Sequence, residues 1–324
     1  MGTIKNFGEI IVEGEEKEKI DYNLYNDFEI QLKEPIYKLI NHTDYVLRLA
    51  LMKDGRLVSG SGRLITIYNK ESYKSDLIIK EHQDRVLSVI QLRTGILASS
   101  SDDKTIKLFK INGINYEIIQ TLNYHTDSVR KVIEIENKTL VSCSKDTSII
   151  FYKKNNLEYI KDYCISTEGP CTSIIQATND EICYSTKNAI GFFDILAKKK
   201  YIIDNISISD QSNGRRVWLT KINNELLIVP GVSKISIVNI NEHKLVRVID
   251  NLDSSDIQGI CKLKKNMFLT GDIKNVLRQW KIEGDNLILI SKKEKAHSSM
   301  INVLLNLGDG HIASGSDDRS IKIW

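Results

Sequence analysis

Proline and long apolar runs are scarce in this sequence. Only 3 of its 324 residues are proline, against 18 glycines, so the turns must be made mainly by Gly, Asn, Asp and Ser. No stretch approaches the roughly 18 apolar residues of a membrane-spanning helix, and residues 1 to 6 lack the apolar run of a signal peptide. The net charge of +3 is too small to indicate nucleic-acid binding. We therefore expect neither a transmembrane segment nor a nucleic-acid partner.

Cysteines at redox or zinc spacing are also missing. The five cysteines are Cys143, Cys164, Cys171, Cys183 and Cys261, and no two of them form a C-x-x-C pair. Their number is odd, and each lies among residues typical of strands. We expect reduced, mostly buried thiols in an intracellular protein rather than a disulfide framework. Within the cell we expect the cytoplasm rather than the nucleus.

Motifs of enzymes and metal sites are absent as well. The sequence contains no Walker loop, no G-x-G-x-x-G, no G-x-S-x-G elbow and no His/Cys cluster at zinc spacing. Paired carboxylates occur at Asp102 with Asp103 and at Asp317 with Asp318, but no third oxygen donor recurs nearby at ligand spacing. We expect no catalytic residue, no cofactor and no metal.

A repeat of about 43 residues fills most of the chain. Within each unit the apolar residues alternate with period 2, as strands require, and no unit shows a convincing 3.6-residue stripe. His42, His82, His125 and His297 each open a unit. The residue that closes the third strand of each unit recurs at steps of 41 to 45 residues. These seven closing residues are Tyr68, Phe109, Tyr152, Phe193, Val238, Trp280 and Trp324.

The number of fourth strands predicts how the repeats close into a ring. Six fourth strands follow the seven sets of three, and the seventh lies near the other end of the sequence, at residues 35–40. Pairing this strand with the last one would remove two open sheet edges, which otherwise invite aggregation. We expect an all-β ring at residues 35–324 and an N-terminal extension at residues 1–34, with residues 4–12 as a candidate extra strand.

The repeats resemble those of the WD40 family, which implies a seven-bladed β-propeller closed by the N-terminal strand. The resemblance depends on a unit-opening His, a Ser-x-Ser in the second strand, a hairpin Asp and a closing aromatic residue. It implies that the Asp accepts from the His and the His bonds the Ser, as structure rather than catalysis, because the set recurs three times. The implied network comprises His82 with Asp103, His125 with Asp146, and His297 with Asp318 and Trp324. The first, fourth, fifth and sixth units depart from the pattern.

The resemblance also implies where a partner binds. In such propellers, peptide ligands often contact the residues three and five positions after the unit-opening His. Together with a lysine beside a hairpin Asp and two arginines of a weaker unit, the predicted partner-binding residues are Tyr45, Leu47, Arg85, Leu87, Arg130, Lys145, Arg215, Arg216, Met300 and Asn302. Four of them would form an apolar arc (Tyr45, Leu47, Leu87 and Met300) and five a cationic sector. The alternative is that any exposed rim carries some Arg and Tyr by chance.

We therefore expect a non-catalytic scaffold, a monomeric propeller that presents a rigid loop face to protein or peptide partners in a multiprotein complex. One alternative is a substrate-recognition subunit of a ubiquitin ligase, although the third strands do not end in the Trp-Asp-x-Arg that such receptors often carry. Another is a phosphoinositide-dependent membrane recruiter acting through Arg215 and Arg216. Against it, Gly214 precedes these arginines where the Phe or Leu of phosphoinositide-binding propellers is wanted, which favours a solvated loop with Trp218 packing down.

Overall fold

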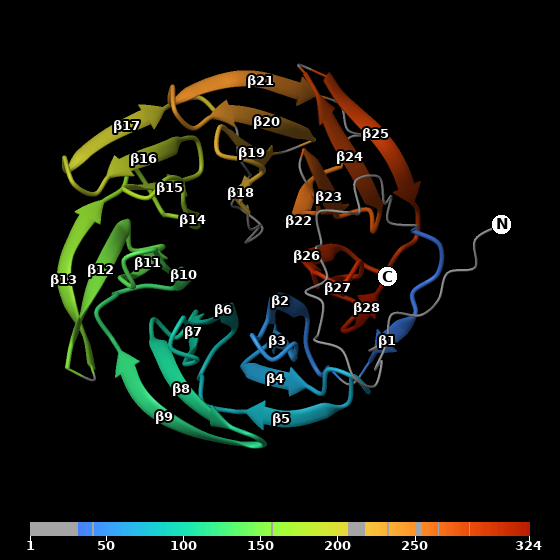
Figure 1. Ribbon diagram of the computed structural model, residues 1–324, viewed down its shortest axis with the longest axis horizontal. Coiled ribbons are helices and arrows are strands. Elements are labelled where there is room, and N and C mark those ends of the chain that lie inside the picture. The colour runs from blue at the N-terminus through green and yellow to red at the C-terminus, as the bar shows by residue number, and fades with distance from the viewer. Residues whose placement is uncertain are drawn as a thin grey trace, which may run out of the picture.

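The computed structural model describes residues 32–40, 42–156, 158–206, 218–231, 233–250, 255–264, 266–284 and 286–324. Within these ranges the chain forms strands and turns and no helix. The strands make seven four-stranded sheets arranged as a ring around a central axis (Figure 1). This confirms the prediction of an all-β, seven-bladed propeller.

Every blade runs from an inner strand beside the axis to an outer strand at the rim (Figure 1). Blade 1 consists of β2 (Val46–Leu51), β3 (Leu57–Ser61), β4 (Leu64–Tyr68) and β5 (Ser75–Ile79), and blade 2 of β6 (Val86–Gln91), β7 (Leu97–Ser101), β8 (Ile106–Asn112) and β9 (Asn115–Leu122). Blade 3 consists of β10 (Val129–Glu134), β11 (Leu140–Ser144), β12 (Ser148–Asn155) and β13 (Glu158–Ser166), and blade 4 of β14 (Ser173–Gln176), β15 (Glu181–Ser185), β16 (Ile190–Asp194) and β17 (Lys199–Ile203).

The remaining three blades follow the same order from inner to outer strand. Blade 5 consists of β18 (Thr220–Lys221), β19 (Leu226–Gly231), β20 (Lys234–Asn239) and β21 (Lys244–Asp250), and blade 6 of β22 (Ile257–Lys262), β23 (Met267–Asp272), β24 (Leu277–Glu283) and β25 (Asn286–Lys293). Blade 7 consists of β26 (Ile301–Asn306), β27 (Ile312–Ser316), β28 (Ile321–Ile323) and β1 (Tyr37–Leu39).

The ring closes in blade 7, where strands from opposite ends of the sequence pair. β1 runs antiparallel to β28, with Tyr37 opposite Ile323 and Leu39 opposite Ile321. The backbone N–H of Ile36 extends this ladder by donating to the carbonyl of Ile323 at 2.8 Å. The predicted closure by an N-terminal strand is confirmed.

The hydrophobic core lies between neighbouring blades. One cluster, for example, joins Val58 and Ile65 of blade 1 to Val89, Leu97 and Phe109 of blade 2. Equivalent clusters fill the other junctions, because each sheet buries apolar side chains on both faces. Each blade therefore depends on both of its neighbours for its core.

A β-bulge recurs near the start of the inner hairpin in five blades, where one extra residue of the first strand faces the second strand. In blade 1 the register shifts between Val46 and Arg48, and in blade 3 between Val129 and Lys131. A bulge re-aims the side chains around it. The residue that follows the extra one, here called the post-bulge residue, is Arg48, Ser88, Lys131, Gly259 or Val303 in the five blades.

Blade 5 departs most from the repeat because its inner strand is short. β18 has two residues, which pair with Leu227 and Ile228 of β19. Pro230 lies two residues farther along β19, where β18 no longer pairs with it. On the opposite edge of β19, Pro230 pairs with Ile235 of β20. A proline cannot donate a ladder hydrogen bond, so the short inner strand leaves room for it.

Blade 4 contains a close approach between two facing residues, Tyr184 of β15 and Gly191 of β16. A Cβ on Gly191 would lie 2.1 Å from Tyr184 Cζ, so the fully buried phenol ring occupies the space of the missing side chain. The Tyr184 hydroxyl donates to Glu168 Oε2 at 2.8 Å, which fixes the far end of the ring. Only glycine fits opposite this tyrosine.

Gly191→Ala is expected to lower the free energy of unfolding by about 1 to 3 kcal/mol, because the buried ring must move. The measurement is urea-induced unfolding followed by fluorescence. Gly169→Ala is the matched control, since nothing lies within 4 Å of its added Cβ. Equal stability of the two variants would contradict the assigned packing.

Deletion of residues 35–40 removes β1 and exposes the edge of β28, so we expect most of the protein to become insoluble. Deletion of residues 1–30 keeps β1 and should leave far more soluble protein. The measurement is the soluble fraction after expression, followed by size-exclusion chromatography. Equal tolerance of both deletions would show that pairing of β1 with β28 does not hold the ring closed.

Candidate functional site

The loop that leads into each blade and the hairpin between its second and third strands lie at the same end of the sheet. Backbone hydrogen bonds tie the two together at equivalent points of the repeat. The N–H of Asp102 donates to the carbonyl of Arg85 at 2.9 Å, and that of Lys145 to Ser128 at 2.9 Å. We call the surface formed by the loops leading into β2, β6, β10 and β26 and the hairpins β3–β4, β7–β8, β11–β12 and β27–β28 the loop face.

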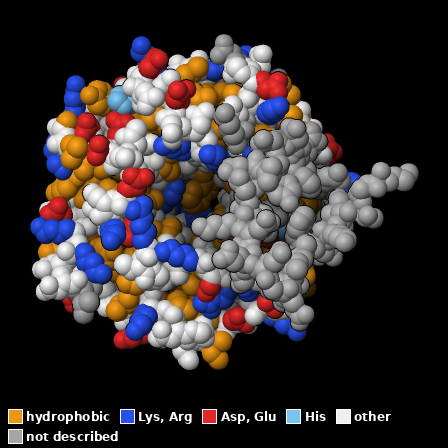
Figure 2. Space-filling model, in the orientation of Figure 1, with side chains coloured by type: hydrophobic (Ala, Val, Ile, Leu, Met, Phe, Trp, Pro, Cys, Tyr) orange, Lys and Arg blue, Asp and Glu red, His pale blue; other side chains and the backbone are white. Residues whose placement is uncertain are grey.

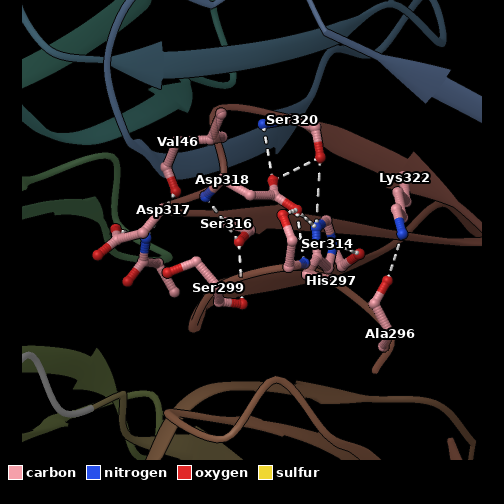
Figure 3. A network of polar contacts seen from close by, with 12 residues as sticks. Val46, Ala296, His297, Ser299, Ser314, Ser316, Asp317, Asp318, Ser320 and Lys322 are labelled. Atoms are coloured by element: carbon pink, nitrogen blue, oxygen red, sulfur yellow. Dashed lines mark hydrogen bonds and ion pairs between the residues drawn. The ribbon is translucent and has the colours of Figure 1, made fainter. Parts of the chain in front are cut away.

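A buried polar network anchors the loop face in blade 7 (Figure 3). His297 Nδ1 lies 2.9 Å from Asp318 Oδ2, and His297 Nε2 lies 2.7 Å from Ser314 Oγ. The indole of Trp324 donates to the same Ser314 hydroxyl at 2.8 Å. Ser320 donates to Asp318 Oδ1 at 2.6 Å. The network therefore joins the leading loop, β27, the inner hairpin and the closing aromatic residue.

Blades 2 and 3 contain the same arrangement. His82 lies 2.7 Å from both Asp103 Oδ2 and Ser99 Oγ. In blade 3, His125 lies 2.8 Å from Asp146 Oδ2 and 2.7 Å from Ser142 Oγ. All three histidines are buried, and buried polar groups require partners.

The carboxylates of these networks are held in the charged form. Burial alone would raise the pKa of Asp103, but hydrogen bonds from His82, Thr105 and the backbone N–H of Gln83 outweigh it and bring the pKa well below its ordinary value. The pKa of Asp318 is lowered in the same way, by His297 and Ser320. Each carboxylate is thus a charged acceptor, and charged acceptors make the stronger hydrogen bonds.

A Ser–His–Asp chain of this geometry has the connectivity of a hydrolase triad. Here, however, the hydroxyls of Ser99, Ser142 and Ser314 belong to residues with no exposed surface, so no substrate could reach them. Trp324 also donates to Ser314. The arrangement occurs in three blades, and in each it fixes a loop.

Two departing blades build this region differently, which the sequence did not reveal, and in blade 1 the buried Nδ1 of His42 has no partner among the described residues. In blade 1 the Tyr68 hydroxyl lies 2.6 Å from His42 Nε2 and 3.0 Å from Ser59 Oγ. In blade 6 Asp272 forms a buried ion pair with Arg278. The sequence offered a signal only in blade 6, where Asp272 and Arg278 occur in a unit without the opening His.

The predicted cationic sector is partly organised by Asp102. Arg85 contacts this carboxylate at 2.8 Å while its side chain stays 53% exposed, and Arg130 lies 3.7 Å away and is 19% exposed. Ser128 also donates to Asp102. Lys145 is 49% exposed and lies 3.8 Å from Asp127. The structure thus brings Arg85 and Arg130 together across blades 2 and 3, whereas Lys145 contacts a different carboxylate.

The predicted apolar arc is wrong in two of its four members. Leu47 and Leu87 are 7% and 0% exposed, because each is the extra residue of a bulge and is turned into the packing rather than onto the surface. Tyr45 is exposed and Met300 is half-buried. Asn302 donates to Asp317 Oδ1 at 2.6 Å and to the carbonyl of Val46 at 3.2 Å, so it joins blade 7 to blade 1.

Arg215 and Arg216 lie outside the residues that the structure describes. Among the described residues, no group of three His, Cys, Asp or Glu side chains is placed to hold a metal ion. The same part of the chain contains no helix long and apolar enough to cross a membrane. All five cysteines are free, and four of them are buried, while Cys164 is exposed.

Two segments of the chain match a family model described as WD domain, G-beta repeat, at residues 74–110 and 290–324. Each segment contains the first three strands of one blade, β6 to β8 or β26 to β28, and the seven sheets supply the architecture that the model implies. The chain thus contains WD40 repeats within a seven-bladed propeller. A comparison with curated proteins finds no match. WD40 propellers are generally protein-interaction scaffolds and typically non-catalytic.

One set of WD40 positions escaped the sequence analysis. The residues three and five positions after the unit-opening His were considered, but the post-bulge residue lies six positions after it. At this spacing the sequence has Arg48, Ser88, Lys131 and Val303. Arg48 and Lys131 occupy equivalent positions of two repeats, and this recurrence is visible in the sequence.

Acidification should weaken the WD40 ring through His42. Burial lowers the pKa of this histidine to about 4, against a smaller opposing effect of the backbone of Arg319. The unfolded chain therefore takes up the proton first, and the stability present above about pH 6.5 is lost as the pH falls towards 4. The measurement is the free energy of unfolding in urea at about pH 7.5 and about pH 4.5. We expect the difference between these two values to be smaller in His42→Gln than in the wild type by roughly 2 to 3 kcal/mol. An unchanged slope in the variant would show that His42 is not held neutral.

Proposed function

We propose that this WD40 protein is a non-catalytic scaffold whose loop face binds a protein or peptide partner. The observation that supports this most directly is the group around Asp102, where Arg85, Ser128 and Arg130 from two blades meet one carboxylate. Such contacts fix the arginine side chains before a partner arrives. A fixed side chain loses less conformational entropy on binding, so the same contacts yield a higher affinity.

The exposed side chains indicate the chemistry of the partner. Tyr45 offers an exposed aromatic ring and Met300 a half-buried apolar side chain, while Arg85 and Lys145 offer exposed cationic groups. Tyrosine and arginine are frequent anchors of protein interfaces. A suitable partner would place an apolar side chain on Tyr45 and acidic groups near Arg85 and Lys145.

The five free thiols support a reducing, intracellular setting for this scaffold. We propose a monomeric propeller within a larger complex, because the blades pair among themselves and β1 already covers the edge of β28. The same fold with loops of a different sequence would accept a different partner.

The triple variant Tyr45→Ala/Arg85→Ala/Lys145→Ala tests the proposed face by affinity purification with mass spectrometry. We expect it to lose proteins that the wild type retains, because truncation of interface anchors commonly weakens binding by about tenfold or more each. The matched control is Lys70→Ala/Lys110→Ala, which removes exposed lysines at the opposite end of the strands.

Thermal unfolding should show that both variants are folded, since the altered side chains lie at the surface. If the triple variant retains every partner of the wild type, or if the control loses the same partners, the proposal for this face is wrong. Turnover of a substrate by the purified protein would overturn the non-catalytic part.

A further inference from the structure

A cavity of about 170 Å³ lies where the inner strands of several blades meet. Figure 2 shows a hollow at the centre of one face of the ring, with Lys and Arg side chains beside it. The cavity is lined by Arg48 of blade 1, Ser88 of blade 2, Lys131 of blade 3 and Trp218, with apolar residues filling the rest of its wall. It is large enough for several water molecules or for one small polar group.

The repeated bulge explains why polar residues line this cavity. Arg48, Ser88 and Lys131 are the post-bulge residues of three consecutive blades, whereas the post-bulge residues of blades 6 and 7 are Gly259 and Val303. The ring therefore has a polar, cationic side and an apolar side at one level of its channel. None of the described residues that line the cavity is acidic.

Trp218 draws the two cations together. The guanidinium carbon of Arg48 lies 4.0 Å from the centre of the indole, and Lys131 Nζ lies 5.1 Å from it. Cations over an aromatic face are attracted to its electrons. The indole Nε1 is itself buried, and it has no hydrogen-bond partner among the described residues. A donor aimed at no acceptor is unusual in a folded protein.

Lys131 is the more exceptional of the two cations. Its ammonium contacts Ser173 Oγ at 3.5 Å, a long distance for a hydrogen bond. Burial lowers the pKa of Lys131 to about 8; Cys143 opposes this, the positive charge of Arg48 adds to it, and Cys171 opposes it. Lys131 is half-buried, and an ammonium withdrawn from water is costly unless it has a counter-charge.

We propose that this cavity binds an anionic oxygen group, a phosphate or a carboxylate, contacted by Lys131, Arg48 and the indole N–H of Trp218. Arg48 already donates to the backbone carbonyls of Leu47 and Leu87, which fixes its guanidinium at the cavity. An anion would add a negative charge beside Lys131 and an acceptor for Trp218 Nε1. Two cations and a neutral donor suit the several oxygens of one such group. The group comes either from a free small anion or from a side chain of a bound peptide that enters the channel.

Lys131→Met is the informative variant, because it removes the charge and keeps an unbranched side chain in the cavity. The first probe is inorganic phosphate, added at constant ionic strength, with thermal unfolding and tryptophan fluorescence as readouts. A ligand that binds the folded state raises the unfolding temperature by mass action. We expect the wild type to respond and Lys131→Met to bind phosphate about tenfold more weakly or worse. Lys154→Met, which alters an exposed lysine of the same blade, should respond like the wild type.

A second arm distinguishes the two sources of the anion. Pools of short peptides with a fixed phosphoserine are compared with pools that carry serine at the same position. If inorganic phosphate binds in a manner that depends on Lys131 and the phosphoserine pool does not bind, the ligand is a free anion. Binding of the phosphoserine pool with higher affinity than phosphate, also dependent on Lys131, identifies a peptide side chain. If neither probe binds, or if Lys131→Met binds as well as the wild type, the cavity holds only water and the proposal is wrong.

The pH dependence provides a further check on the role of Lys131. Among the described residues, the charged and titratable groups that act on it are Arg48, Cys143 and Cys171, and burial keeps the Cys171 thiol neutral by raising its pKa. Inorganic phosphate itself gains negative charge near neutral pH, so the wild type is compared with Lys131→Met from about pH 7 to about pH 9. The higher affinity of the wild type should shrink towards that of the variant as Lys131 loses its charge. A difference in affinity that does not change with pH would exclude contact with a charged Lys131. These results are separate from the loop-face experiment, since Lys131→Met leaves Tyr45, Arg85 and Lys145 unchanged.

Discussion

The need to pair buried polar groups where each leading loop crosses the inner hairpin shapes this propeller. Water cannot reach these groups, so each blade must supply its own partners. Blades 2, 3 and 7 do so with a histidine, an aspartate and a serine, as in the contacts of His82 with Asp103 and Ser99. Blade 1 uses Tyr68 with His42, and blade 6 uses Asp272 with Arg278. The residues that make these contacts thus vary among the five blades, and in blade 1 the Nδ1 of His42 has no partner among the described residues.

The same hairpins carry both the buried network and the residues proposed for binding. Asp103 is buried against His82, while its neighbour Asp102 holds Arg85 at the surface. In blade 3, Asp146 is bonded to His125, while the adjacent Lys145 is exposed. In each hairpin one Asp fixes the turn, and the residue before it lies nearer the surface. The position of the surface group therefore depends on the buried bonds beside it.

Periodicity made the architecture predictable from the sequence. A step near 43 residues and one displaced strand at residues 35–40 are enough to specify seven blades and their closure. The exposure of side chains in the inner strands was less predictable. Side chains normally alternate between the two faces of a strand, but a bulge interrupts this alternation. For this reason Leu47 and Leu87 are buried rather than exposed.

Contacts that join distant parts of the chain could not be predicted from spacing. Arg48, Lys131 and Trp218 come from blades 1, 3 and 5, and no local pattern shows that one indole lies beside both cations. The repeat does specify that equivalent residues reach the same level of the channel. It does not specify which blade places a large side chain beside those residues. Here that side chain is Trp218, which precedes the two-residue inner strand of the irregular blade 5.

Closure by distant strands has a consequence for how the protein is made. β1 leaves the ribosome early, but its partner β28 is translated more than 280 residues later, since Tyr37 pairs with Ile323. At ordinary translation speeds the first strand waits roughly 15 to 60 seconds for its partner. During that time the nascent chain carries an unsatisfied strand edge, which is a substrate for chaperones and a hazard on crowded polysomes. The synthesis of β28 therefore decides when this edge is covered and the ring can close.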